Sequence, residues 1–466
     1  MPMGLHALEK ALQQDLAWIN IPPKPWTVAS SDLCDVVIIG AGMAGMTVAF
    51  ALKKRGITNI RMFDEAPHGK EGPWDTYARM KILRSPKDLM GPSLHIPNLT
   101  FQAWYIAQYG QEPWDLLGKI PTSLWMDYLK WYRKVLHLPI ENETALLSIA
   151  QDENVLRLTI QKEGKTHFVH TRKLILATGR SGFGGLHIPS FAKHLSKSSY
   201  AHTSEAIDFQ KLSGKKILIV GGGASAFDAA AVALETNAAS VDILIRHEKL
   251  TNKNIACSLA YPGLNCGFHK LDDATRWKFL QHAYQRCAPP PVEALQRLQG
   301  HDNILVHPNQ IIEQVTHRDN VLSIKTQKQM FSADFLILGT GFAIDGSLRK
   351  ELRDIFPQIL LWKDRPHLDH AIKHLGAFPY LGPHMEFLEK TPGCAPYLKN
   401  IHCYNFGANC SHGPITGDIP GISVGAERVA EGITADLFAS CIADYYARLQ
   451  GYNKVDFNHE DFSFLL

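Results

Sequence analysis

Cysteine is scarce in this chain, and it never occurs in the spacings in which it does chemistry. There are eight cysteines in 466 residues, and no two of them form a Cys-x-x-Cys pair. Zinc sites need closely spaced ligands and thiol–disulfide exchange needs two neighbouring cysteines, so the sequence disfavours both. A chain of this length buries a large core without disulfide bonds. We therefore expect reduced thiols, no metal site and a cytoplasmic protein.

An excess of charge of one sign is also missing. The 48 Lys and Arg residues against 45 Asp and Glu residues give a net charge of +3, without a long basic run. This balance argues against a nucleic-acid partner. The N-terminus lacks the basic and apolar segments of a signal peptide. The most apolar stretch, Val36–Leu52, is short and contains glycines, so we expect no integral membrane segment.

What the sequence does contain is a glycine-rich turn between a strand-like run and a helical pattern. The apolar run 35–39 leads into Gly40, Gly42 and Gly45, and a helical pattern and a second apolar run at 59–63 follow. Gly40 permits a tight turn, Gly42 lets a pyrophosphate approach the backbone, and Gly45 lets helix and strand pack closely. The amides at the helix N-terminus attract phosphate. This unit predicts a dinucleotide site.

The same arrangement recurs 181 residues further along the chain. An apolar run at 215–220 precedes a turn that contains Gly221, Gly223, Ser225 and Ala226, and a helical pattern and another apolar run follow. This internal duplication indicates a second nucleotide-binding unit.

A later apolar run closes each unit with a Thr-Gly pair. One pair is Thr178 and Gly179, and the other is Thr340 and Gly341. We expect both pairs to contribute to cofactor binding.

The two units differ where their second strand ends. The first ends in Asp64, followed by Glu65, and a carboxylate there binds ribose hydroxyls and repels a 2′-phosphate. The first site should therefore take FAD or NAD. The second unit ends in Arg246, whose guanidinium suits a 2′-phosphate. The second site should therefore take NADPH rather than NADH.

These motifs make the chain similar to flavoproteins with two dinucleotide-binding domains. Among those it resembles the flavin-containing (class B) and N-hydroxylating monooxygenases, and the segment EGPWDTYARMKILRSPKDL resembles the bacterial FAD-dependent urate hydroxylase type. One departure is that Ser196 and Ser198 replace the Phe and Gly of a Phe-x-Gly-x-x-x-His signature, although His202 is present. The resemblance rests on VVIIGAGMAG, ILATG, GKKILIVGGGASAFDAA, FLILGTGF and GDIPGI.

The resemblance implies an α/β fold with two Rossmann-like domains of the three-layer ββα type. The NADPH domain is expected to be inserted in the FAD domain. The predicted parts are a lead-in at 1–31, the FAD domain at 32–205 and 335–466, and the NADPH domain at 206–334.

The resemblance also implies a reaction. NADPH reduces the flavin, oxygen then forms a flavin hydroperoxide, and this species hydroxylates a small organic substrate. Urate hydroxylation is one specific form of this activity. Two alternatives stay open: an NADPH-dependent reductase that inserts no oxygen, and a nucleotide-binding protein without catalysis. The substrate and the oligomeric state are open as well.

Five further residues are assigned to the flavin by this resemblance. Gly417 and Asp418 precede the last long helix, where Asp418 suits an N-cap and the helix N-terminus faces the flavin. Arg84 and Lys87 are the candidate catalytic residues, because a cation beside the flavin binds an anionic substrate or stabilises negative charge. Trp74 is expected to pack against the cofactor.

Overall fold

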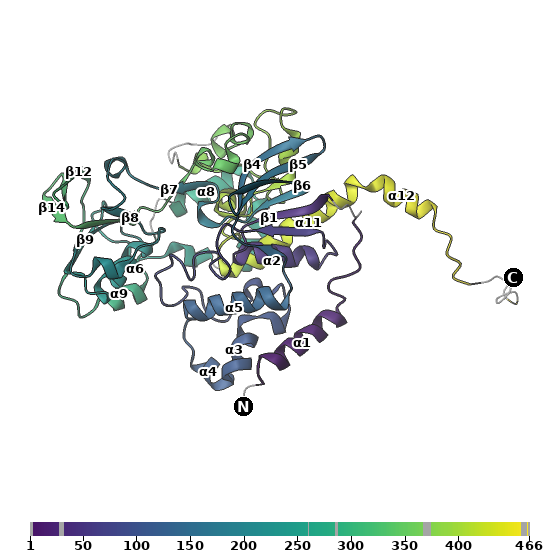
Figure 1. The fold of residues 1–466 in the computed structure, drawn as a ribbon, viewed down its shortest axis with the longest axis horizontal. Helices are drawn as coiled ribbons and strands as arrows, with labels where there is room; N and C mark the ends of the chain where they lie inside the picture. Colours follow the sequence, from purple (N-terminus) through teal and green to yellow (C-terminus); the bar gives the residue numbers. More distant parts are fainter. Residues whose placement is uncertain are drawn as a thin grey trace.

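The computed structural model describes residues 3–27, 32–259, 261–284, 288–366, 374–457 and 464. The chain folds as an α/β protein around two sheets that contain parallel strands. In Figure 1 the first sheet, around β1 and β6, lies to the right, and the second sheet, around β9, lies to the left. The predicted α/β fold class is confirmed.

The first sheet is parallel around its central strand and antiparallel along one edge. Its order is β3-β2-β1-β6-β5-β4, and β17 also pairs with β6. β1 pairs in parallel with β2 and β6, whereas β5 runs antiparallel to β4 and β6. The strands are β1 (Leu33–Ile39), β2 (Ile60–Phe63), β3 (Ile140–Glu141), β4 (Thr144–Asp152), β5 (Val155–Lys162), β6 (Lys165–Leu176) and β17 (Ile401–His402).

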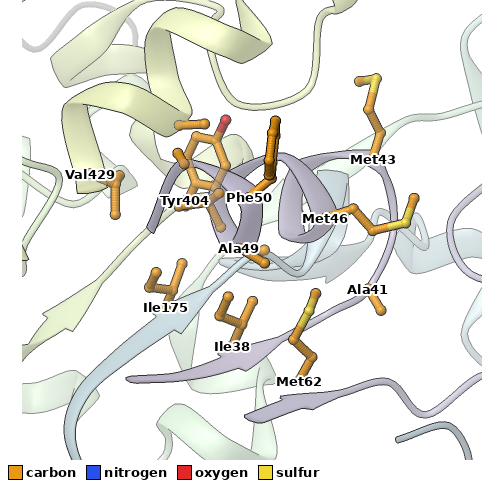
Figure 2. Packing of buried hydrophobic residues seen from close by; sticks show 14 of the residues in the cluster. Ile38, Ala41, Met43, Met46, Ala49, Phe50, Met62, Ile175, Tyr404 and Val429 are labelled. Carbon is orange, nitrogen blue, oxygen red and sulfur yellow. The ribbon is translucent and has the colours of Figure 1, made fainter. Parts of the chain in front are cut away.

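The core of the first unit forms around the helix that follows the first glycine turn. This helix, α2 (Met43–Lys53), is buried along most of its length, because the sheet covers one side and α11 (Ile422–Ser440) covers another. Figure 2 shows Ile38 and Ile175 on the strands facing α2, with Val429 of α11 beside it. A helix enclosed in this way holds the preceding turn in place.

The second sheet is parallel throughout. Its order is β11-β10-β9-β15-β8. A separate antiparallel sheet, β12-β13-β14, packs nearby. The strands are β8 (Tyr200–His202), β9 (Lys216–Val220), β10 (Ser240–Leu244), β11 (Ile304–His307), β12 (Ile312–Arg318), β13 (Val321–Thr326), β14 (Met330–Ala333) and β15 (Phe335–Leu338).

Alternating side chains divide the second unit into three layers. Ile217 and Ile219 pack against α6 (Ala224–Glu235), whereas Leu218 and Leu336 pack against the antiparallel sheet. Successive side chains of a strand point to opposite faces, so a fully apolar strand supplies two cores. The unit is therefore the expected ββα sandwich.

The sheet pairing includes two strands that the predicted domain boundaries assign to the other unit. β8 lies before the boundary at 205 and β15 lies after the boundary at 334, yet both belong to the second sheet. Parallel pairing of β15 with β9 and β8 decides this. The chain enters and leaves the second unit through β7 (Gly184–Leu186) and β16 (Phe342–Ile344), which pair antiparallel. The boundary at residue 31 falls outside the described residues.

Helices cover the first unit and fill the connections. The aromatic segment 101–136, expected to be helical, forms three helices whose rings pack on one another around Phe101 and Tyr128. Trp104 is buried among these rings. The remaining helices are α1 (Leu5–Trp18), α3 (Phe101–Tyr109), α4 (Gln111–Leu116), α5 (Thr122–Val135), α7 (Pro262–Gly267), α8 (Asp273–Tyr284), α9 (Val292–Leu298) and α10 (Asn409–His412).

The last helix of the sequence prediction is in fact two helices. α11 ends at Ser440, Cys441 leaves the helical conformation at ψ 21°, and α12 (Ile442–Gln450) follows. α11 loses its buried face after Leu437, and the described α12 has no buried residue, so it extends away from the body in Figure 1. Among the described residues, no helix has the length and apolarity needed to cross a membrane.

Candidate functional site

Both glycine turns open into one cavity of about 1540 Å³ that lies between the two sheets. Most of the site residues expected from the sequence line it. Gly45 and Ala226 do not, because they pack behind their turns, and Lys87 does not either. The predicted residues on the cavity wall are Gly40, Gly42, Asp64, Glu65, Trp74, Arg84, Thr178, Gly179, Gly221, Gly223, Ser225, Arg246, Thr340, Gly341, Gly417 and Asp418.

The first turn leaves no room for side chains behind it and open space in front. Gly40 has φ +95°, and a Cβ there would lie 2.4 Å from the Ala177 carbonyl oxygen. A Cβ on Gly45 would lie 1.8 Å from the Gly40 carbonyl oxygen. A Cβ on Gly42 would meet nothing closer than 3.7 Å, on the side facing the cavity. The backbone of Gly42 is therefore open to a bound phosphate.

The Asp64 carboxylate forms hydrogen bonds with the backbone of the first turn. One oxygen accepts a hydrogen bond from Ala41 N at 2.6 Å, and the other accepts from Ala66 N at 2.8 Å. Burial raises the pKa of Asp64, and the two amides oppose this shift. Each oxygen keeps a second lone pair for another donor, and Glu65 lies exposed beside it. These carboxylate acceptors fit the two ribose hydroxyls of an adenosine.

The second turn has the same shape with different chemistry. Gly221 has φ +135°, and a Cβ on Gly223, before α6, would meet nothing within 4 Å. Ser225 is exposed in the first turn of α6. Arg246 is also exposed on the cavity wall and donates through Nε to His247 Nε2 at 3.2 Å, while Lys249 lines the wall nearby. Two cations at this strand end fit a 2′-phosphate.

The Thr-Gly turns are each held by a side chain from elsewhere. Asn405 Nδ2 donates to Leu176 O at 3.0 Å and to Thr178 Oγ1 at 3.2 Å. In the second unit, His202 Nε2 donates to Gly341 O at 2.9 Å, and its Nδ1 accepts from Ser204 N at 3.1 Å. His202 is thus a neutral strut, and its burial lowers its pKa.

The segment before α11 reaches the cavity, but its capping differs from the sequence prediction. Gly417 and Asp418 line the wall, whereas the Asp418 side chain makes no capping hydrogen bond. A 3-10 turn, Ile419–Gly421, intervenes, so α11 begins only at Ile422. The surrounding protein raises the pKa of Asp418, and the charge of Arg180 opposes this shift.

The structure separates the two candidate catalytic cations. Arg84 lines the cavity and forms a 2.8 Å ion pair with Asp228 of α6, which joins the first unit to the second. Lys87 points away from the cavity and donates to Asp115 O at 3.3 Å, with its ammonium over the Trp114 ring. Packing of the segment against α4 decides this difference. Trp74 lies on the cavity wall, as expected.

Several cavity residues carried no signal of their own in the sequence. Arg180, Tyr77 and Tyr284 line the wall together with Phe406 and Asn409, and they come from four separate segments. Arg180 differs from the others in one respect, because it directly follows the predicted Thr-Gly pair in the sequence.

His412 is buried outside the cavity wall, where it forms hydrogen bonds with Gly382 O at 2.9 Å and with Arg428 at 3.2 Å. No cysteine occurs among the described residues of the cavity wall.

Comparison of the sequence with known proteins agrees with this geometry. Residues 37–261 match the family described as pyridine nucleotide-disulphide oxidoreductase. Over 464 residues the chain is 36% identical to the FAD-dependent urate hydroxylase of Xanthomonas campestris pv. campestris, covering 98% of both chains.

Two solved structures illustrate the shared fold. Ornithine hydroxylase from Pseudomonas aeruginosa superposes with a TM-score of 0.68 at 17% identity, over 87% of this chain and all of that one. L-lysine 6-monooxygenase from Pseudomonas syringae has a TM-score of 0.65 at 19% identity, over 87% of this chain and 99% of that one. At this identity the likeness shows the fold alone.

Proposed function

We propose a reaction for this chain, which belongs to the family of the FAD-dependent urate hydroxylase. It is an FAD-dependent monooxygenase that takes its electrons from NADPH, and its proposed substrate is urate or a closely related planar heterocycle. The observation that carries this proposal is the single cavity onto which both glycine turns open. Two nucleotides bound at these turns would meet in one shared cavity.

The first turn and its surroundings are the proposed flavin site. The amides at the start of α2 bind the pyrophosphate beside Gly42, and Asp64 accepts hydrogen bonds from the ribose. When bound, the flavin supplies hydride acceptance and oxygen activation. Gly417 and Asp418 place the start of α11 at the cavity, and the partial positive charge of a helix N-terminus favours negative charge next to it.

The second turn is the proposed NADPH site. The open backbone at Gly223 and the exposed Ser225 offer donors to the pyrophosphate at the start of α6. Arg246, with Lys249, binds the 2′-phosphate. Arg84 and Asp228 link this helix to the first unit and act as positioning residues.

Disulfide reduction, which the name of the matched family suggests, has no support in the cavity. That chemistry needs a cysteine pair next to the flavin, and the described wall contains no cysteine. Oxygen transfer to a small molecule needs a closed space instead, because water destroys reactive intermediates. In this proposal, the two bound nucleotides shield the shared cavity from water.

The test is a coupled assay on purified protein. We expect the purified protein to contain FAD and to oxidise NADPH faster when urate is present. One molecule of O2 should be consumed for each molecule of urate lost. Ornithine and lysine serve as control substrates of the structural neighbours and should not accelerate NADPH oxidation. NADPH oxidation that yields only hydrogen peroxide, with or without urate, would contradict the hydroxylase and leave a reductase. Protein that binds neither FAD nor NADPH would contradict both.

A further inference from the structure

Arg180 has a place on the cavity wall that nucleotide binding does not explain. It follows the first Thr-Gly pair, and its side chain is exposed to the cavity. Among the described residues it has neither a hydrogen bond nor an ion pair. The other arginines of the wall are each bound to protein: Arg79 to Thr203 and Glu205, Arg84 to Asp228, Arg246 to His247, and Arg349 to Glu351.

An aromatic ring holds the Arg180 guanidinium in position. The guanidinium carbon lies 5.3 Å from the centroid of the Phe406 ring. Phe406 in turn packs on the buried Phe378 at 5.8 Å between centroids. The neighbouring Asn405 bonds to Thr178, so the loops that carry Phe406 and Arg180 are tied together. The cation is therefore pre-positioned, which lowers the entropy cost of binding a ligand.

The surrounding wall suits a flat polar ring. Tyr284 packs on the same Phe378 at 6.2 Å between ring centroids, and Asn409 lines the cavity with it. Tyr77 also lines the cavity. Burial raises the pKa of Tyr77, Tyr284 and Asp418, and the charge of Arg180 opposes this rise in all three. Asp418 belongs to the proposed flavin edge, so this part of the cavity lies next to the reacting end of that site.

We propose that Arg180, stacked on Phe406, binds the anionic edge of a planar heterocyclic substrate, with Tyr284 and Tyr77 beside the ring. This assignment rests on the proposed function and names the chemical class of its substrate. A guanidinium offers two parallel N–H donors that match adjacent acceptors on one edge of an oxidised purine. Aromatic side chains hold such a ring by stacking. The urate monoanion combines both features.

The experiment is calorimetric titration of urate into the FAD-loaded enzyme without NADPH, so that binding is measured apart from turnover. Arg180→Gln should raise the dissociation constant at least tenfold, because a charge-assisted pair is lost. Arg180→Lys keeps the charge but loses the paired N–H donors of the guanidinium. Its dissociation constant for urate should lie between those of Arg180→Gln and the wild type. The KM for NADPH and the FAD content should stay within twofold of wild type, which also shows that the variants fold.

A matched control exists elsewhere in the first unit. Arg157 on β5 lies over Phe168 at 5.2 Å and does not line the cavity. Arg157→Gln should leave urate binding unchanged. Wild-type urate affinity in Arg180→Gln would overturn the assignment, and so would a raised KM for NADPH with unchanged urate affinity. Wild-type enzyme that holds FAD and oxidises NADPH but does not bind urate would overturn the assignment as well. The protein would then still be an FAD- and NADPH-dependent oxidoreductase.

Discussion

The two nucleotide turns solve the same packing problem with the glycine on opposite sides. In the first unit, α2 carries Gly45 and the facing strand end carries Ala177, whose Cβ would lie 3.5 Å from a Cβ on Gly45. In the second unit, α6 carries Ala226 and the facing strand end carries Gly339. A Cβ on Gly339 would lie 2.8 Å from the Cβ of Ala226. Each unit has one glycine and one alanine at this contact.

This exchange teaches that the third glycine of the fingerprint is a packing requirement rather than a ligand contact. Helix and strand approach closely in both units, and the position of Gly45 also faces the Gly40 carbonyl oxygen, 1.8 Å from a Cβ there. The chemistry that separates the two sites lies elsewhere, at the ends of β2 and β10. Asp64 is buried and fixed by two amides, whereas Arg246 is exposed. Substitutions in both units test this comparison.

The largest effect is expected at the glycine of the first turn. Gly45→Ala places a Cβ 1.8 Å from the Gly40 carbonyl oxygen, where only backbone can yield. We expect loss of bound FAD and at least about 3 kcal/mol of stability, the upper end for overpacking. Flavin absorbance per protein and urea unfolding measure these losses. Retention of FAD at wild-type affinity would contradict the packing role.

The second unit offers the reciprocal test. Gly339→Ala should weaken NADPH binding, because its Cβ collides with that of Ala226. Ala226→Gly in the same chain recreates the arrangement of the first unit and should restore most of the binding. The KM for NADPH of the single and double variants measures this coupling. Equal KM values in the two variants would show that the contact is not the reason for the glycine.

Next in size is the loss of the carboxylate in the first unit. Asp64→Asn keeps the shape, but its amide nitrogen must face Ala41 N or Ala66 N, so one buried donor is left unpaired. This costs about 1–3 kcal/mol. The variant also lacks the charged acceptor for the ribose hydroxyls, so we expect a roughly 10- to 100-fold higher dissociation constant for FAD. Titration of apoprotein by flavin fluorescence measures it, and an unchanged KM for NADPH is the control.

A smaller effect is expected at the exposed cation of the second unit. Arg246→Ala should raise the KM for NADPH by about tenfold, the lower end for a hydrogen bond to a charged group. The KM for NADH should stay the same, because NADH lacks the 2′-phosphate. Lys249→Ala should act in the same direction with a smaller change. Equal increases for both coenzymes would remove the basis for assigning the phosphate to Arg246.

The smallest effect concerns the side chains that hold the two Thr-Gly turns, Asn405 in the first unit and His202 in the second. Only His202 is titratable. Burial lowers the pKa of His202, with Glu205 opposing and with His187 and Lys197 adding to the shift. The unfolded chain therefore takes up a proton below pH 6.5 that the folded chain does not, so stability falls as pH falls. The slope from one such group reaches about 1.4 kcal/mol per pH unit.

His202→Gln removes this titration and keeps a donor for the Gly341 carbonyl. The difference in unfolding free energy between wild type and variant should shrink as the pH falls below 6.5. Chemical unfolding at several pH values measures it. Buried His402 titrates in both proteins, with its pKa lowered to about 3 by burial, and cancels in the difference. A pH-independent difference would contradict the strut role.

The sequence alone determined what is encoded within a few tens of residues. The two glycine turns, their helices and the contrast between Asp64 and Arg246 were readable because strand, turn and helix are neighbours in the chain. The family resemblance that these motifs carry implied the three-layer architecture. Local patterns suffice there because each proposed nucleotide contact lies in one backbone turn or in one side chain at the end of a strand.

Tertiary structure decided everything that depends on distant segments. It paired Arg84 with Asp228, directed Lys87 away from the cavity, and moved β8 and β15 into the second sheet. It also brought Arg180 and Phe406 together, 226 positions apart. Such contacts arise from how whole layers pack, and no local spacing records where two layers meet.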